Sequence, residues 1–207
     1  NAWRVNTGLE FDIGSKLVAN IDGTYWRSSR DQYAPGIVGS RLQNALNGLG
    51  GANCTGTTPG ANGCEYFNPF VNAGPSNPTL GIANPFYVAG NENSSDLVSF
   101  IQIPNGTFQR EEQFLIDAVI SGGTGFELPG GEVAFAIGGQ YRKNNFITRP
   151  LSDTSNLNIN PCYREGDRSC VGTVTDGVGP FIFLGGTRPS SLSQEVYAAF
   201  AEVQLPS

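Results

Sequence analysis

The sequence predicts an all-β protein, namely a segment of an antiparallel transmembrane β-barrel with long strands and two long extracellular loops that hold short helices and local disulfides. Three observations predict it. Long stretches alternate apolar and polar residues, the connections between them alternate between short and long, and only 14 % of the residues are charged. Alternation with few charges is typical of a sheet that has one face in an apolar medium.

The composition excludes several other classes of protein. No apolar run approaches the roughly 18 residues of a transmembrane helix, and a chain with 39 % hydrophobic and 11 % aromatic residues is too apolar to be disordered. A net charge of -6 without a cluster of Lys and Arg argues against a nucleic-acid partner. A soluble sandwich and an outer-membrane barrel remain.

The chain contains no histidine. This excludes Ser–His and Cys–His nucleophile pairs, imidazole acid–base catalysis and His-ligated metals. The sequence also shows no other catalytic constellation, so we expect the protein not to be an enzyme, and we expect no catalytic residue, metal site or cofactor. The chain also lacks methionine and begins at Asn1, so we expect it to be an internal piece of a longer protein.

The first two strands are predicted at about 2–14 and 17–28, joined by a tight turn at Gly14, Ser15 and Lys16. Odd-numbered positions form the apolar face of the first strand: Trp3, Val5, Thr7, Leu9, Phe11 and Ile13. These strands exceed the usual ~5–6 residues of soluble sheets and reach the ~9–11 residues that cross a bilayer at a tilt.

The alternation then stops for a long stretch, which predicts a first extracellular loop at about 29–111. Within it, residues 36–49 have helical spacing and end at Gly50 and Gly51, which suits a helix stop. A second short helix is predicted to start at Ser94 or Ser95 as its N-cap. The disulfide and the helices favour an ordered loop.

Three further strands complete the predicted sheet. Strands at about 112–127 and 132–147 form a second hairpin around a turn at 128–131, and a last strand follows at about 194–205. The second extracellular loop is predicted at about 148–193. The whole chain, 1–207, is expected to be part of one β-barrel domain.

The four cysteines form two local pairs, Cys54 with Cys64 and Cys162 with Cys170, each inside a stretch rich in Gly, Asn and Pro. Zinc sites have tighter spacing, usually with histidine. We expect two disulfides formed in an oxidising compartment, each contributing roughly 2–3 kcal/mol. The alternative is free thiols buried as small apolar groups.

The order of the connections predicts an orientation. Outer-membrane barrels have tight turns on the periplasmic rim and long loops on the outer rim. The turns at 14–16 and 128–131, and the end at Pro206 and Ser207, are therefore expected on the periplasmic side, and both cysteine-containing loops outside the cell. Soluble sandwiches rarely keep this asymmetry.

Several segments resemble TonB-dependent outer-membrane receptors, particularly those of sphingomonad- and Caulobacter-like bacteria. The resemblance covers nearly the whole chain in order. The segments are RLQNALNGLGG (41–51) leading to Cys54, GCEYFNPF (63–70), DAVISG (117–122), ELPGG (127–131), GGQYR (138–142) and EVYAAFAEV (195–203). Each is weak alone, but together they are fairly specific.

The resemblance implies a barrel of twenty-two strands closed by an N-terminal plug domain that carries the TonB-contacting segment. This sequence contains no plug domain, so it is expected to be an internal barrel segment. The implied function is energy-coupled uptake of a scarce nutrient, such as a ferric siderophore or an oligosaccharide, across the outer membrane of a Gram-negative bacterium. The implied partners are membrane lipid and lipopolysaccharide, the rest of the same receptor, TonB and the small-molecule nutrient.

The loops supply the candidate ligand-binding residues. Aromatic rings beside Asn and Asp are typical of a loop-built site for a sugar or another ring-bearing ligand, and arginines near the outer strand ends would meet an anionic ligand or lipopolysaccharide phosphate. The candidates are Tyr33, Tyr66, Phe86, Tyr87, Arg30 and Arg149. Alternatively the aromatics form a small core beneath the loop, with Phe67 and Phe70 buried.

Two other functions remain open. The chain would be a secreted or surface β-sandwich, with a binding or structural role, if the apolar strand faces packed against a second sheet. The other alternative is a porin-like passive channel or an outer-membrane barrel enzyme, of which a plug domain in the gene context would exclude the passive channel. The sequence does not identify the transported nutrient.

Overall fold

A computed structural model describes residues 1–206. Ser207, which the sequence places with Pro206 on the periplasmic side, lies outside the described residues. The fold is mostly β, with a five-stranded antiparallel sheet and two disulfides, and this confirms the coarser part of the predicted fold class. The elements are β1 Ala2–Ile13, β2 Leu17–Ile37, α1 Gly39–Leu46, a 3-10 turn Val71–Ala73, β3 Ser76–Asn77, β4 Ile82–Ala83, α2 Ser95–Ile101, β5 Gln102–Leu128, β6 Gly131–Pro150 and β7 Ser190–Gln204.

The chain folds as two compact units. The sheet unit comprises Asn1–Asp31, Phe108–Thr148 and the segment from Ser190 onward. The loop unit comprises Gln32–Thr107 and Arg149–Pro189. Each unit is described by itself below.

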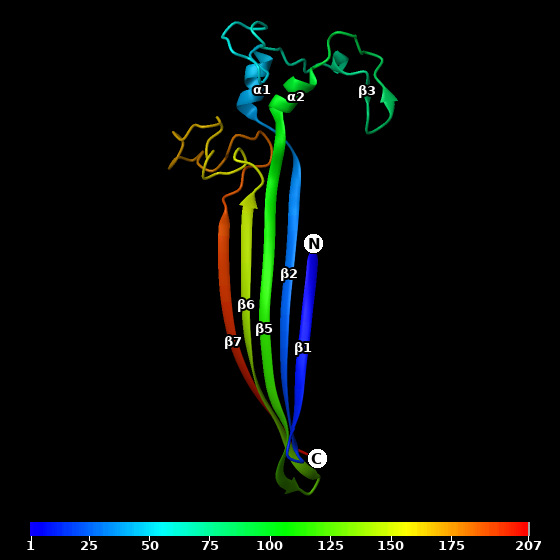
Figure 1. The fold of residues 1–207 in the computed structure, drawn as a ribbon, viewed down its shortest axis with the longest axis vertical. Coiled ribbons are helices and arrows are strands. Elements are labelled where there is room, and N and C mark those ends of the chain that lie inside the picture. The colour runs from blue at the N-terminus through cyan, green and yellow to red at the C-terminus, as the bar shows by residue number, and fades with distance from the viewer. Residues whose placement is uncertain (207) are drawn as a thin grey trace. The chain divides into compact units, whose positions relative to one another are not determined.

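The sheet unit is built from two hairpins and a fifth strand, in the order β1-β2-β5-β6-β7 (Figure 1). β1 pairs with β2 from Ala2 opposite Ser28 to Ile13 opposite Leu17. Gly14 has a φ of 65°, the left-handed conformation that lets a three-residue turn close this hairpin. β6 pairs with β7 from Ala134 opposite Gln204 onward. In Figure 1 both short turns lie at the same end of the sheet.

The strands run further than the sequence analysis placed them. β2 continues to Ile37 instead of residue 28, and β5 begins at Gln102 instead of residue 112. Alternation reports a contrast between the two faces of a strand, whereas a strand itself needs only a hydrogen-bonding partner. Beyond the apolar stretch the face contrast ends but the pairing continues, so sequence pattern underestimates the length. Parts of the predicted 29–111 loop are therefore strand.

The odd-numbered face of β1 stays exposed, although it is apolar. Leu9 is 60 % exposed, Phe11 is 47 %, and Ile137 on β6 is 53 %. The only other sheet among residues 1–206 is the pair β3–β4, with two residues in each strand. The arrangement expected for a sandwich, in which these side chains pack against a second large sheet, is therefore not found in the described residues.

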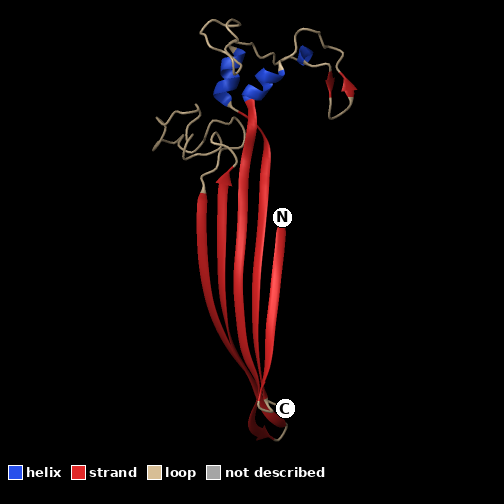
Figure 2. Ribbon diagram, in the orientation of Figure 1, coloured by secondary structure: helices blue, strands red, loops and turns tan. Residues whose placement is uncertain are grey.

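The loop unit holds both α-helices (Figure 2). α1 confirms the predicted first helix but ends at Leu46, earlier than predicted. Its stop signal is Gly48 (φ 75°) rather than Gly50 and Gly51. The Gly48 N–H donates to the carbonyl of Ala45 and the Leu49 N–H to that of Asn44, which is the Schellman pattern of a helix end.

α2 confirms the predicted second helix. Ser94 is its N-cap, and its hydroxyl accepts a hydrogen bond of 3.0 Å from the Leu97 N–H. Leu97 and Ile101 pack with Ala45 of α1 into a small buried core. No helix in the described part of the chain is long and apolar enough to cross a membrane.

The two predicted disulfides, Cys54–Cys64 and Cys162–Cys170, are confirmed. The alternative that Phe67 and Phe70 are both buried is wrong for Phe70. Phe67 is half-buried against the helical core, whereas Phe70 is 74 % exposed and lies outside that cluster.

Candidate functional site

A row of aromatic side chains crosses the apolar face of the sheet unit. Trp3 and Tyr25 have ring centroids 5.1 Å apart, and Tyr141 and Tyr197 have centroids 5.0 Å apart. Phe114 of β5 lies 6.3 Å from the Tyr141 ring. This aromatic row therefore includes one ring from each of the five strands. Toward the turns, the same face continues with exposed aliphatic side chains.

A charged row follows the aromatic row. Four strands carry a charged residue two positions beyond the ring, on the same face and away from the turns: Arg27 on β2, Glu112 on β5, Lys143 on β6 and Glu195 on β7. The Arg27 Nε lies 3.6 Å from the Glu112 carboxylate, and the Lys143 Nζ lies 2.9 Å from that of Glu195. The Nε of Arg110, two residues further along β5 on the same face, also lies 3.6 Å from the Glu112 carboxylate.

The opposite face of the sheet carries hydrogen-bonded polar side chains. The Gln113 amide donates to the Asn144 oxygen over 2.9 Å, and the Gln140 amide donates to the Asp117 carboxylate over 2.8 Å. These part-buried pairs join β5 to β6. Between β5 and β6 the sheet therefore has an apolar face and a hydrogen-bonded polar face, as the alternation predicts.

Ionic and backbone contacts hold the turn end of the sheet unit together. The Lys16 ammonium donates to the Glu132 carboxylate at 2.8 Å, and the Gly125 N–H donates to the same carboxylate at 2.6 Å. This hydrogen bond from Lys16 to Glu132 raises the pKa of Lys16 above its usual range. The contact joins the two short turns, which lie 116 residues apart in sequence.

The loop unit contains a polar pocket of about 720 Å³ between α1 and the start of the Cys162–Cys170 loop. An ion pair forms one wall. The Arg41 guanidinium donates to both oxygens of Glu165, at 2.6 and 2.9 Å, and to the carbonyl of Phe100. The remaining lining side chains are polar or aromatic: Ser40, Gln43, Asn44, Asn47, Tyr163 and Arg164.

Tyr163 reaches the pocket because residue 39 has no side chain. A Cβ atom on Gly39 would collide with the Tyr163 ring and hydroxyl. The Gly39 N–H is fixed by a hydrogen bond of 2.9 Å to the Pro180 carbonyl. The ring is thus positioned against the first turn of α1, and Tyr163, which lines the pocket, is 47 % exposed.

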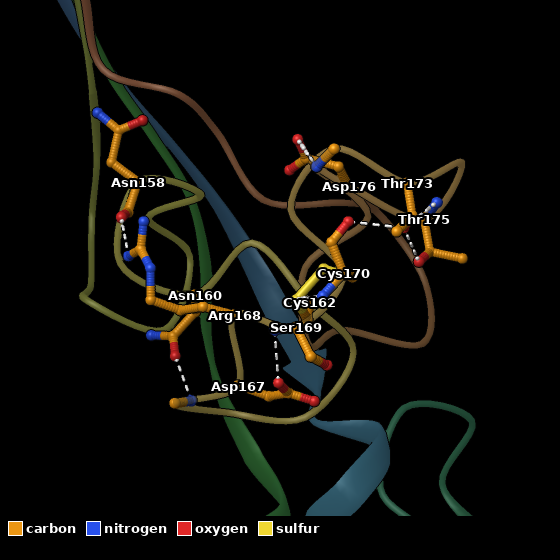
Figure 3. Close-up of a disulfide and its surroundings, with 12 residues drawn as sticks. Asn158, Asn160, Cys162, Asp167, Arg168, Ser169, Cys170, Thr173, Thr175 and Asp176 are labelled. Atoms are coloured by element: carbon orange, nitrogen blue, oxygen red, sulfur yellow. Dashed lines mark hydrogen bonds between the residues drawn. A yellow bond between two sulfur atoms is a disulfide. The ribbon is translucent and has the colours of Figure 1, made fainter.

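Hydrogen bonds to backbone groups order the Cys162–Cys170 loop (Figure 3). The buried Asn160 accepts from the Gly166 N–H at 2.8 Å, and the Arg168 guanidinium donates to the Asn158 carbonyl at 2.8 Å. The Asp167 carboxylate accepts from the Ser169 N–H at 2.8 Å, and this bond holds the pKa of Asp167 below its usual range.

The structure distributes the candidate ligand-binding residues over separate places. Arg30 lies in the sheet unit, hydrogen-bonded to Gln109 in a small hollow of about 160 Å³. Tyr33, 71 % exposed, lines another hollow of about 220 Å³ in the loop unit. Phe86 lines an open apolar hollow between residues 71 and 86.

The other three candidates make different contacts. Tyr66 lies against Gly48, where a Cβ atom would meet its ring. The Tyr87 hydroxyl donates to the Glu92 carboxylate, and Arg149 is exposed at the end of β6. None of the six candidates lines the polar pocket, so their role in ligand binding stays a prediction.

The polar pocket was missed by the sequence analysis, which followed only the apolar side of the 36–49 helix. On the other side of the helix, polar residues recur at helical spacing at positions 40, 44 and 47, and this pattern can be read from the sequence. The second wall comes from residues 163–165, more than a hundred positions away in sequence. That proximity had no signal in a single sequence.

Within residues 1–206, no group of three or more Cys, Asp and Glu side chains is arranged to hold a metal ion. Comparisons of the chain with family models, with curated proteins and with solved structures give no match.

Proposed function

We propose that this chain forms part of the wall and the external loops of a TonB-dependent outer-membrane receptor, which takes up a small nutrient. The observation that carries the proposal is the aromatic row followed by the charged row on an exposed apolar face. Transmembrane barrels have an apolar band about 25 Å tall, bordered by aromatic girdles at the headgroup level. Charged side chains are tolerated just beyond that level.

The dimensions of the face agree with this band. From Trp3 to Ile13, about ten residue steps at ~3.4 Å each give ~34 Å along the strand. At the tilt of ~40° common for membrane strands, this is ~26 Å across the bilayer. The long-loop end would be the outer surface, where the charged row meets headgroups and lipopolysaccharide.

The sheet edges support a larger assembly. β1 and β7 each pair on one side only. An open strand edge is not tolerated in lipid because its N–H and C=O groups have no partner there. Further strands of the same receptor would pair with both edges, and its plug and TonB-contacting segment would lie elsewhere in that longer protein.

Cysteine labelling of the full-length protein in intact Gram-negative cells tests the topology, because the four cysteines of this chain are paired in disulfides. We expect a membrane-impermeant maleimide to modify Val174→Cys, in the second loop, without treatment. Ser15→Cys, in the first turn, should react only after the outer membrane is permeabilised. Equal labelling of both sites in intact cells would show that both ends of the strands are outside the cell and would overturn the proposal.

A matched pair of variants tests which face meets lipid. Ile137 and Ala136 are adjacent on β6 and face opposite sides, Ile137 opposite Ala201 and Ala136 opposite Glu202. A fluorophore attached to Ile137→Cys should be quenched by spin-labelled lipid, and one attached to Ala136→Cys should not. Reading the gene upstream of Asn1 tests energy coupling, since a gene without a plug and a TonB-contacting segment would contradict that part.

A further inference from the structure

We propose that the polar pocket between α1 and the Cys162–Cys170 loop binds a saccharide. The proposal rests on the proposed function in one respect: it names the ligand class that such a receptor would take up. The binding itself depends only on residues of the loop unit, and is argued from their chemistry.

Amide side chains dominate one wall of the pocket. Gln43, Asn44 and Asn47 line it from successive turns of the α1 region. An amide offers two N–H donors and one acceptor, which match sugar hydroxyls because each hydroxyl both donates and accepts. In the described chain these three side chains make no hydrogen bond to another residue, so their capacity is available to a ligand.

Tyr163 supplies an aromatic surface beside the amides. Its ring lies against Gly39, and the residue as a whole is 47 % exposed. The flat C–H face of a sugar ring packs on such a ring, while the phenol hydroxyl adds a hydrogen bond. Aromatic rings and a few placed polar groups in a concave site are the usual composition of a small-molecule pocket.

The charges that line the pocket favour a saccharide over a strongly anionic ligand. Arg41 and Glu165 neutralise each other in the bidentate pair, with Thr154 also donating to Glu165 at 3.0 Å. Arg164 is then the one lining cation without an ion pair among residues 1–206. A single cation suits a neutral sugar or a uronate, whereas a multiply charged ferric chelate would meet too little compensating charge.

The volume fits a short oligosaccharide. A pocket of about 720 Å³ lies within the range of small-ligand sites and holds roughly two or three sugar rings. The ion pair also fixes the shape: Arg41 packs over the Phe100 ring at 5.3 Å and so links α1, α2 and residue 165. The site is therefore largely formed before a ligand arrives.

Titration calorimetry on the purified full-length protein tests the proposal, with maltotriose, cellotriose, trigalacturonate and a ferric tris-catecholate as probes. We expect at least one trisaccharide to bind and the ferric probe not to bind at this pocket. Asn44→Ala and Tyr163→Ala should each weaken binding about tenfold or more, because each removes a directed contact. Arg164→Gln should weaken trigalacturonate binding selectively.

Matched controls keep the test specific. Asn158→Ala and Phe183→Ala remove an exposed amide and an exposed ring outside the pocket, and should change affinity less than twofold. Tyr163→Phe keeps the ring and should retain most of the affinity, whereas Gly39→Ala should displace the ring and lose it. Circular dichroism verifies that each variant is folded, because Arg164→Gln itself removes a tryptic site.

Two results overturn the proposal: no trisaccharide binds the folded protein, or binding persists unchanged in both Asn44→Ala and Tyr163→Ala. Neither result bears on the maleimide labelling, which reports membrane topology alone. Saccharide binding by a protein that fails the labelling test would support the pocket and contradict the receptor. The reverse outcome would support the receptor with another ligand.

Discussion

Tyr141 and Tyr197 occupy directly opposite positions on β6 and β7, and their ring centroids lie 5.0 Å apart. The next opposite pair on this face, away from the turns, is Lys143 with Glu195, which form an ion pair. The cross-strand pairs on this face thus change from aromatic to ionic over two residues along the strands. This change marks the edge of the exposed apolar face.

The tyrosine pair should show coupling in a double-mutant cycle. Tyr141→Ala and Tyr197→Ala each remove one ring, and the double variant removes both. We expect a coupling free energy of about 0.5–1.5 kcal/mol, since paired rings contribute that much beyond their buried area. Urea unfolding of the full-length protein in detergent micelles measures it. Strictly additive effects would show that the rings do not interact.

Two neighbouring glycines on β6 should differ in their tolerance to alanine. A Cβ atom on Gly138 would lie 2.5 Å from the Phe200 ring and 2.9 Å from the Ala118 carbonyl, whereas one on Gly139 meets only the Ala198 carbonyl at 3.5 Å. Gly138→Ala should lower the free energy of unfolding by about 1–3 kcal/mol through overpacking. Gly139→Ala is the control and should cost less. Equal costs would contradict the packing.

The two neighbouring serines at the start of α2 should differ in how much their replacement destabilises the helix. Ser94→Ala removes the acceptor of the Leu97 N–H and should destabilise the helix by about 1 kcal/mol. Ser95→Ala is the control, because Ser95 is already in the helix and exposed. Hydrogen exchange of the Leu97 amide measures both. Similar exchange rates in the two variants would exclude the cap.

The Tyr87–Glu92 contact should make loop stability depend on pH. The Tyr87 hydroxyl donates to the Glu92 carboxylate, and this holds the pKa of Glu92 below its usual range. Because the folded-state pKa lies below the unfolded-state value, the contribution is present above the unfolded pKa. It is lost as the pH falls through the folded pKa. The same bond raises the pKa of Tyr87, so at high pH the contribution is lost as the pH rises through that raised value.

Carboxyl NMR titration measures this effect. Tyr87→Phe should move the Glu92 pKa upward, toward its usual range, because the hydroxyl donor is gone. Tyr33→Phe is the control and should leave it in place. An unchanged Glu92 pKa in Tyr87→Phe would show that the hydroxyl is not its partner.

Removing the Cys162–Cys170 disulfide should open the loop that it closes. Arg164 and Arg168 lie inside this loop and are exposed tryptic sites. A short loop loses about 2–3 kcal/mol of stabilisation without its disulfide, so the Cys162→Ser, Cys170→Ser variant should be cleaved about 30–150-fold faster. The Cys54→Ser, Cys64→Ser variant should keep the original rate at these two sites. Equal rates in all three proteins would contradict the prediction.

The sequence alone determined the elements whose signal is local. Alternation placed the five strands and their turns, helical spacing and a serine cap placed α1 and α2, and cysteine spacing paired the disulfides. The ends of β2 and β5 were missed, because residues such as Gln32 and Gly106 pair where no face contrast marks a strand. Phe70 was misplaced because the burial of a loop aromatic depends on which residues pack beside it, and of Phe67 and Phe70 only Phe67 packs against the helical core.

Only the tertiary structure decided what distant residues do together. The aromatic row needs the register of five strands, which sets Tyr141 opposite Tyr197 and brings Phe114 beside Tyr141. The polar pocket needs residue 163 to meet residue 39 across more than a hundred positions. Local propensity acts over a few residues and is written in their types, whereas these contacts follow from pairing and packing of the whole chain. The sequence therefore specified the strands, the helices and the disulfides, and the tertiary structure specified the aromatic row and the polar pocket.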